Sequence, residues 1–268
     1  MKILYDHQIF LNQNYGGPSR YFYNLVKNIS KLHSTSICAP FHINNYLENL
    51  PREIVDGFNI NNFIFNNFPY RLKKLITNKF FDKVNYYVQR KKISKFKPDI
   101  IHRTYFDNYK TNLPTVLTIY DLIHEKFHNL YGKDSNYRPK KAAIENADQI
   151  ICISKNTLND LKYYYDLKDK KTSVIYLGSD LRDLKNGIIK KKQKDNYLLF
   201  VGKRTKYKNF DNFIKAYSLS KKLKNEFKII CFGGGKFSRD EYKLFEENSI
   251  ERKKIENING SDSRLIQL

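Results

Sequence analysis

The chain of 268 residues is long enough for one large domain or two modest ones. Hydrophobic residues make up 41% of it and aromatic residues 15%, which excludes an intrinsically disordered protein. The net charge of +22 would suit anionic partners, but the chain is also crowded with Lys, Asn, Ile and Tyr, so part of this charge reflects a compositional bias.

The sequence gives no sign of membrane insertion or secretion. No run of about 18 apolar residues occurs, and Met1–Asp6 reaches a charge too early for a signal peptide and predicts a buried strand. Cys38, Cys152 and Cys231 lie far apart and form no C-x-x-C pair, which argues against a zinc knuckle or a disulfide framework. We therefore expect buried strand cysteines and a cytoplasmic protein.

Short apolar runs alternate with amphipathic helical patterns, which is typical of parallel strands joined by helices. The first strand is expected at Lys2–Tyr5. Pro18 then opens a helix, because a missing N–H costs nothing in the first helical turn. An apolar stripe at helical spacing is expected along this helix, made of Tyr21 or Phe22 with Leu25, Ile29 and Leu32.

Further strands are indicated by apolar runs bounded by prolines or polar residues. Ser154 or Asn156 is available to cap the helix that follows the run at 149–153. The expected strands are Ser36–Ala39, Pro98–His102, Thr115–Tyr120, Gln149–Ile153 and Thr172–Tyr176.

The segment Ser179–Asp195 breaks this pattern. It contains Gly187 and the run Lys190–Lys192, and it is interpreted as a linker between a domain at 1–178 and a second one at 196–268. The second domain is expected to contain strand 197–201, helix 209–222, strand 227–232, three glycines and helix 240–248. Because a doubly wound sheet normally has about 5–6 strands, this domain looks half built.

The first candidate site is the loop Tyr15–Arg20, between the first strand and its helix. Gly16 and Gly17 let the backbone approach a ligand closely, the helix start offers N–H groups to an anion, and Arg20 adds a positive charge. A purely structural Gly-Gly-Pro turn is the alternative interpretation.

The second candidate site is Val201–Phe210, where a strand, a glycine and a helix start follow one another. Gly202 allows a tight turn, and Arg204 and Lys208 can face a diphosphate at the helix N-terminus. A solvated basic loop is the alternative here.

The third candidate site is Ile119–Glu125, directly after an apolar strand. Ionisable side chains at the carboxyl end of a parallel strand lie where ligands bind in such sheets. Asp121 and His124 could exchange a proton with a sugar hydroxyl. The alternative is a helix cap for Asp121 and a surface position for His124.

In content and order, these motifs resemble glycosyltransferase family 4, especially its bacterial surface-polysaccharide branch. The resemblance implies an α/β fold of the GT-B type, with an N-terminal Rossmann-like domain for the acceptor, a cleft, and a C-terminal Rossmann-like domain for a nucleotide sugar. It also implies sugar transfer with retention to a glycan or lipid-linked acceptor, in polysaccharide or lipopolysaccharide biosynthesis. The matching segments run within Lys2–Leu268 and are Tyr15–Phe22, Thr118–Glu125, Ala147–Leu161 and Val201–Phe210.

The resemblance also implies residue roles. Arg204 and Lys208 would neutralise the donor diphosphate as it leaves, and would be the catalytic residues. The substrate-binding residues would be Gly16 and Gly17 beside the phosphates, Arg20 in the same loop, Gly202 in the donor loop, and Asp121 and His124 on the acceptor or the transferred sugar. No Asp-x-Asp occurs, so neither a metal nor another cofactor is expected, and protein cations replace Mg²⁺.

Two features depart from the family pattern. Tyr120 stands where many relatives have a histidine, so no catalytic role attaches to it. The sequence also lacks the paired-glutamate segment with a Glu-Gly-Phe-Gly-like start that grips the donor in the family. We therefore expect a truncated C-terminal domain with little transfer activity of its own. The alternative function is a non-catalytic module that binds an acceptor or a partner.

The segment Arg71–Lys97 is rich in Lys and Arg, contains Asp82 as its one acid, and interleaves apolar residues at helical spacing. It predicts attachment to an anionic membrane surface, apolar side down. The alternative is an ordinary helix whose apolar side packs on its own sheet. Nucleic acid is not expected as a partner, because no Arg-rich or aromatic-interleaved motif accompanies the charge.

Overall fold

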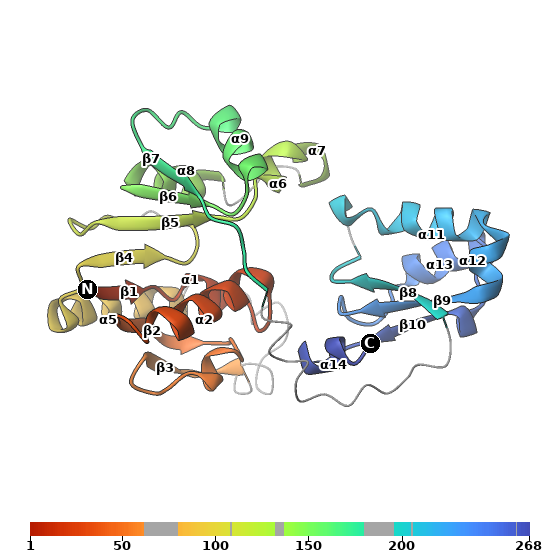
Figure 1. Cartoon of the computed structure of the whole chain (residues 1–268), viewed down its shortest axis with the longest axis horizontal. Coiled ribbons are helices and arrows are strands. Elements are labelled where there is room, and N and C mark those ends of the chain that lie inside the picture. Colours follow the sequence, from red (N-terminus) through yellow and green to blue (C-terminus); the bar gives the residue numbers. More distant parts are fainter. Residues whose placement is uncertain (62–79, 108, 132–136, 180–195, 205, 261) are drawn as a thin grey trace. The chain divides into compact units, whose positions relative to one another are not determined.

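The computed structural model describes residues 1–61, 80–107, 109–131, 137–179, 196–204, 206–260 and 262–268. The chain divides into two compact units, Met1–Leu177 and Gly178–Leu268 (Figure 1). The predicted linker, from residue 180 onward, lies outside the described residues.

The first unit contains a seven-stranded sheet in which every neighbouring pair is parallel. Its order is β3-β2-β1-β4-β5-β6-β7, so the direction of winding reverses between β1 and β4. In open α/β sheets, ligands bind outside the carboxyl ends of the strands at such a reversal. The strands are β1 (Lys2–Tyr5), β2 (Ser34–His42), β3 (Val55–Asn59), β4 (Ile100–Arg103), β5 (Thr115–Ile119), β6 (Gln149–Cys152) and β7 (Lys171–Val174).

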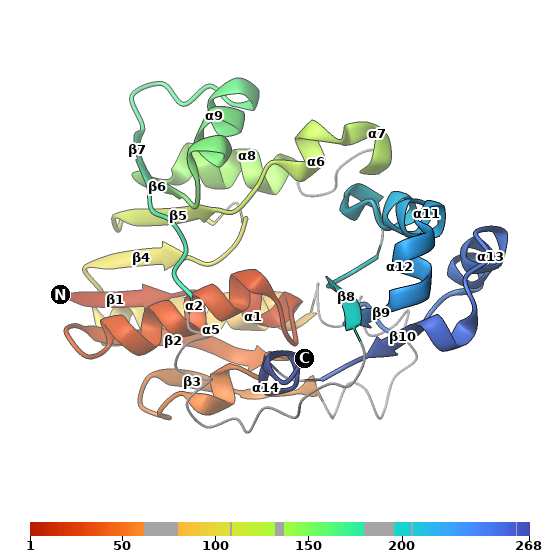
Figure 2. The same cartoon turned by 45° about the vertical axis from the view of Figure 1, so that its right-hand side comes forward.

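Helices cover both faces of this sheet, because successive strand residues point to opposite sides. Tyr5 of β1 packs with Phe22 of α2, whereas Leu4 packs with Phe96 of α5. Figure 2 shows α2 in front of the strands and α5 behind them. The helices are α1 (Gln8–Asn12), α2 (Gly17–Ile29), η1 (Leu47–Asn49), α5 (Asp82–Phe96), α6 (Ile123–Lys126), α7 (His128–Tyr131), α8 (Tyr137–Asn146) and α9 (Lys155–Tyr164).

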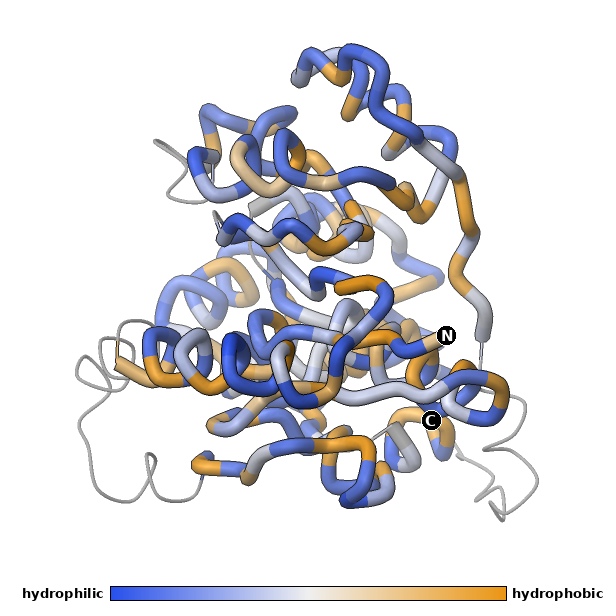
Figure 3. The backbone as a smooth tube through the Cα atoms, turned by 90° about the vertical axis from the view of Figure 1, so that its left-hand side faces the viewer, coloured by the Kyte–Doolittle hydropathy of each residue, from blue (hydrophilic) through white to orange (hydrophobic). Residues whose placement is uncertain are grey.

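The buried side of α2 differs from the predicted stripe. Pro18 stands in the first turn as expected, but the fully buried residues are Ser19, Phe22 and Val26. Leu32 is 81% exposed, because the helix ends at Ile29 and the chain has already turned toward β2. The change between hydrophilic and hydrophobic residues within each helix is visible in Figure 3.

The predictions of a cap for α9 and of buried strand cysteines are confirmed. Ser154 caps α9, since its hydroxyl accepts a hydrogen bond of 3.0 Å from the N–H of Thr157. Cys38, Cys152 and Cys231 are free and buried in β2, in β6 and in β9 (Phe227–Phe232), respectively. Among the described residues, no helix combines the length and the apolar composition that crossing a bilayer requires.

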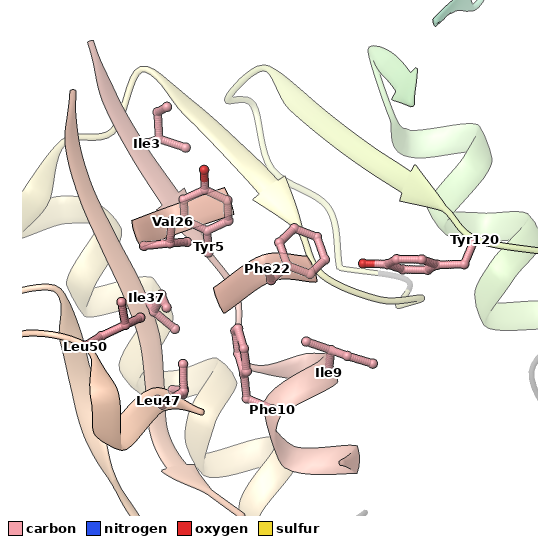
Figure 4. Packing of buried hydrophobic residues seen from close by; sticks show 11 residues of the cluster. Ile3, Tyr5, Ile9, Phe10, Phe22, Val26, Ile37, Leu47, Leu50 and Tyr120 are labelled. Carbon is pink, nitrogen blue, oxygen red and sulfur yellow. The ribbon is translucent and has the colours of Figure 1, made fainter. Parts of the chain in front are cut away.

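An aromatic cluster closes the core of the first unit beneath the carboxyl ends of the strands. The His102 ring lies 5.0 Å from Phe22 and 5.4 Å from Tyr5. Burial lowers the pKa of His102 to about 3, so the imidazole is neutral, and its Nε2 lies 2.8 Å from the hydroxyl of Thr118. Figure 4 shows Tyr120, at the end of β5, directing its hydroxyl toward Phe22.

The second unit has a parallel sheet of the order β10-β9-β8. The helix predicted at 209–222 is interrupted at Ser220, whose hydroxyl accepts from the N–H of Leu223 and caps a new helix. Phe210, Ile214 and Phe245 pack with β9 in its core. The elements are β8 (Asn196–Val201), η3 (Lys206–Lys208), α11 (Phe210–Leu219), α12 (Lys221–Glu226), β9 (Phe227–Phe232), α13 (Arg239–Glu247), η4 (Arg252–Lys254), β10 (Ile255–Ile258) and α14 (Asp262–Ile266).

Candidate functional site

The glycine loop of the first unit joins α1 to α2. Gly16 has an extended backbone (φ 177°), and Gly17 begins α2. The side-chain oxygen of Gln13 accepts a hydrogen bond of 3.3 Å from the N–H of Ser19, so Gln13 caps the helix that Gly16 cannot cap. A Cβ on Gly16 would collide with the Gln13 amide. Asn44 fixes Gln13 in turn, by donating to its carbonyl oxygen at 2.6 Å.

The first turn of α2 connects this loop to the end of β5. Arg20 is half-buried, and its N–H donates to the Gly16 carbonyl at 2.9 Å. The ring of Tyr21 meets the ring of Tyr120 edge-on, with centroids 5.8 Å apart. The glycine loop and the residues after β5 therefore share one region at the carboxyl edge of the sheet.

Asp121 and His124 follow β5 in that region. Asp121 is exposed, and its carboxylate accepts a hydrogen bond of 3.2 Å from the N–H of Ile123, at the start of α6. Because Leu122 is the N-cap residue of α6, this contact is a local turn ahead of the helix and not the N-cap that the alternative interpretation expected. His124 is half-buried within α6. Their contacts with an acceptor or a sugar stay predictions.

Asp6 was not singled out from the sequence, although it lies where the winding reverses. It follows β1 directly and is 1% exposed. Its carboxylate accepts from the hydroxyl of Thr104, from the N–H of Thr104 at 3.0 Å and from the N–H of Gln8 at 3.3 Å. Burial, reinforced by the charge of Asp107, raises the pKa of Asp6 to about 6. Asp6 thus joins the ends of β1 and β4.

Two further polar pairs surround Asp6. Arg103 and Asp107, both buried, form an ion pair of 2.7 Å, and His7 lies 2.9 Å from Asp82. The sequence signal that could have identified this cluster is the position of its residues at the ends of two strands. Asp6 directly follows one apolar strand and the segment 103–107 begins at the end of another, but the sequence alone does not show that these strands are neighbours.

In the second unit, a loop at the carboxyl end of β8 carries the remaining predicted residues. Gly202 has φ +106°, a conformation that favours glycine. Lys208 ends η3 and is exposed, with its ammonium 5.1 Å from the centre of the Tyr207 ring. Asn209 then takes a left-handed conformation and α11 begins at Phe210. Lys208 is thus available to an anion.

Arg204, in contrast, is only 5% exposed and has protein partners. Its Nε donates to Glu241 at 2.6 Å, and its Nη1 donates to the Gly233 carbonyl at 2.8 Å. Its Nη2 donates to the Gly235 carbonyl at 3.0 Å. Direct contact of Arg204 with a diphosphate, as the sequence suggests, stays a prediction, and the observed contacts give it a role in holding neighbouring loops.

Family comparisons cover both units. The model of Glycosyltransferase Family 4 matches residues 15–183, and the model of Glycosyl transferases group 1 matches residues 182–261. A Campylobacter jejuni protein, named N-acetylgalactosamine-N,N'-diacetylbacillosaminyl-diphospho-undecaprenol 4-alpha-N-acetylgalactosaminyltransferase, is 31% identical over 108 residues. An uncharacterised glycosyltransferase of Methanocaldococcus jannaschii is 33% identical over 101 residues. These matches cover 40% and 35% of this chain, but only 29% and 26% of the two relatives.

Solved structures extend the likeness in fold to the whole chain. WaaG, described as a glycosyltransferase involved in lipopolysaccharide biosynthesis, matches with a TM-score of 0.62 and 17% identity over 100% of this chain and 72% of its own. TarM of S. aureus matches with a TM-score of 0.63 and 14% identity over 97% of this chain and 77% of its own. Both are GT-B structures, and at these identities they show the fold alone.

Proposed function

Because the chain belongs to glycosyltransferase family 4, whose model matches more than half of it, we propose that it transfers a sugar from a nucleotide-sugar donor to a glycan or lipid-linked acceptor. The observation that carries this proposal is the loop after β8. It carries the exposed Lys208 and the positive-φ Gly202 after the carboxyl end of β8, within the segment that the group 1 model matches.

The proposed role of Lys208 follows from the negative charge of the leaving diphosphate. When the bond between sugar and diphosphate breaks, negative charge grows on the leaving diphosphate, and a fixed cation stabilises that charge most in the transition state. Lys208 can supply this cation directly. We propose that the transfer retains the anomeric configuration and that no metal ion is needed, since no Asp-x-Asp is present to hold one.

The acceptor is proposed to bind at the carboxyl edge of the first unit. Asp121 and His124 lie in this region and offer groups that can bond sugar hydroxyls. The printed name of the Campylobacter jejuni relative specifies a diphospho-undecaprenol acceptor. We therefore favour a lipid-linked acceptor and a role in polysaccharide or lipopolysaccharide biosynthesis.

We also propose that α5 brings the protein to an anionic membrane surface. Arg90, Lys91 and Lys95 are exposed on this helix. Of the apolar residues expected to face the membrane, Phe81 is buried, Val84 and Val88 are half-buried, and Phe80 is exposed, so the attraction proposed here is mainly electrostatic. The apolar residues predicted in the same segment at 72, 75 and 76 lie outside the described residues.

Titration calorimetry with UDP, GDP and ADP tests the donor site. We expect the purified complete gene product to bind one of them, with a dissociation constant on the order of 10–100 µM. Lys208→Ala should weaken that binding about tenfold, because it removes a charge-assisted contact. Lys215→Ala, which removes another exposed lysine, from α11, should leave it unchanged.

Two results would argue against the proposal in different ways. Equal binding by the wild type and Lys208→Ala would remove Lys208 from the donor site. Absence of binding to any of the three nucleotides would contradict the transferase. Nucleotide binding without sugar transfer would instead indicate a non-catalytic binding protein.

A further inference from the structure

Arg204 joins the loop after β8 to the turn after β9. Its guanidinium donates to the carbonyl oxygens of Gly233 at 2.8 Å, Gly235 at 3.0 Å and Lys236 at 3.3 Å. The glycines of this turn have φ values of +81°, +74° and +78° for Gly233, Gly234 and Gly235. Such a backbone strongly favours glycine, and Arg204 holds three of its carbonyl groups toward one side.

The fit between Arg204 and the turn is close. A Cβ on Gly234 would lie 2.7 Å from Nη1 of Arg204 and 2.8 Å from the carbonyl oxygen of Gly202. The ring of Phe237 covers the guanidinium, with its centre 4.7 Å from Cζ. The cation is therefore enclosed by the turn and an aromatic ring, which leaves it poorly placed to meet a ligand.

Glu241 completes the arrangement from α13. One carboxylate oxygen accepts from Nε of Arg204 at 2.6 Å, and the other accepts from the N–H of Ser238 at 2.7 Å. The Ser238 hydroxyl accepts from the N–H of Glu241, so the two residues form a capping box at the start of α13. Burial pushes the pKa of Glu241 up, but the hydrogen bonds and charge of Arg204, with the contacts of Ser238, hold it below its usual value.

We propose that Arg204 and Glu241 are a positioning pair, which fixes the loop that carries Lys208 and does not itself contact the donor diphosphate. Arg204 lies in the same loop as Lys208, and its contacts anchor that loop to the turn after β9 and to α13. Holding Lys208 in place before the ligand arrives lowers the entropic cost of binding. This inference rests on the proposed function, because it concerns the same diphosphate site.

The variant Glu241→Gln separates positioning from direct contact, because the two roles predict opposite signs. If Arg204 bound the diphosphate, Glu241→Gln would remove a negative charge and release the guanidinium, so the affinity for inorganic pyrophosphate would rise. If the pair positions the loop, the same variant loosens the loop and the affinity falls. We expect a fall of about tenfold, the effect of losing about 1.4 kcal/mol.

Two further variants guard against a simple loss of folding. Arg204→Lys keeps the charge but cannot reach three carbonyl groups and a carboxylate at once, so positioning predicts a fall similar to that of Glu241→Gln. Glu247→Gln is the control, because Glu247 lies on the same helix and is exposed beside Lys243. It should change the affinity by less than about twofold, as exposed pairs contribute little. The affinities are measured at a temperature at which circular dichroism and thermal melting show that all variants are folded.

The outcomes also distinguish this inference from the proposed function. If the wild type binds pyrophosphate and Glu241→Gln binds it equally or more tightly, the positioning pair is wrong while the transferase proposal stands. If Arg204→Lys binds pyrophosphate as tightly as the wild type does, the positive charge alone explains the role of residue 204, and the inference again fails. If the wild type does not bind pyrophosphate, the donor site itself is contradicted.

Discussion

Asp6 is a buried carboxylic acid at the carboxyl end of β1. It is 1% exposed, and Asp107 is among the charges that act on it, opposed in part by His7. Its hydrogen bonds to Thr104 and Gln8 partly offset the cost of burial, but its pKa still rises to about 6. Asp6 therefore joins β1 to β4 at a cost in stability that depends on pH.

The sign of that dependence follows from linkage. The unfolded chain releases the Asp6 proton near pH 3.9, whereas the folded chain keeps it until about pH 6. The native state therefore binds more protons in this window, and the contribution of Asp6 to the free energy of unfolding falls as the pH rises.

We predict that Asp6→Asn removes this dependence while its side-chain oxygen still accepts hydrogen bonds. Relative to Asp6→Asn, the wild type should lose roughly 2–3 kcal/mol of unfolding free energy between about pH 4 and pH 6. Urea denaturation of both proteins across this range measures the difference. Parallel curves for the two proteins would show that the Asp6 pKa is not raised.

Single residues also show where reasoning from sequence stops. Spacing placed Arg204 and Lys208 in one loop, and the structure confirms that both belong to the segment between β8 and α11. Spacing does not reveal that Arg204 is buried against Gly233 and Glu241 while Lys208 is exposed, because those partners are some 30 residues away in the chain. Burial depends on such contacts, which only the folded chain brings together.

Helices and strands were predictable where the local pattern is strong. β1 and β9 have the predicted bounds, because each is a short apolar run with polar or turn-forming neighbours. β3 was missed, since Asp56, Gly57 and Asn59 leave its sequence with only two apolar residues and Gly57 interrupts the run. Gly57 has φ +155°, and a Cβ there would meet the backbone of Ala39, so the neighbouring strand and not the local sequence explains that glycine.

The helix α5 carries an element-scale prediction. Its exposed lysines should attract anionic lipid, each contributing about 1 kcal/mol near the surface. Flotation with phosphatidylglycerol vesicles should recover the protein at low salt. Recovery should fall in several hundred millimolar salt, where screening is strong, and in the variant Lys91→Glu with Lys95→Glu.

Lys92 is left unchanged in that variant, because it pairs with Asp56 at 3.2 Å and its replacement would disturb the contact with β3. The matched control is Lys221→Glu with Lys222→Glu, which reverses two exposed lysines at the start of α12. Equal recovery with neutral and anionic vesicles, or none with either, would leave α5 as a solvated helix of the first unit.

For the whole molecule, alternation of strands and helices correctly predicted an α/β fold in two parts. The order β10-β9-β8 of the second unit repeats the order β3-β2-β1 of the first. In both units the second strand pairs with the first, and the third strand pairs with the second on its far side. Pairing order could not be derived from the sequence. It depends on which strands meet, and the cluster around Asp6 became visible only when β1 and β4 proved to be neighbours.

The central claim is that this chain belongs to a sugar-transferring enzyme, and the most direct test is transfer itself. The protein is incubated with a nucleotide sugar of the nucleotide that it binds and with a polyprenyl-diphosphate-linked acceptor. The reaction is run with and without EDTA, which removes divalent metal ions. The anomeric configuration of the product is then determined by NMR. We predict a glycoside with the anomeric configuration of the donor, formed equally in both conditions and strongly reduced in Lys208→Ala. A folded protein that transfers no sugar, or that yields the opposite anomer, would contradict the account.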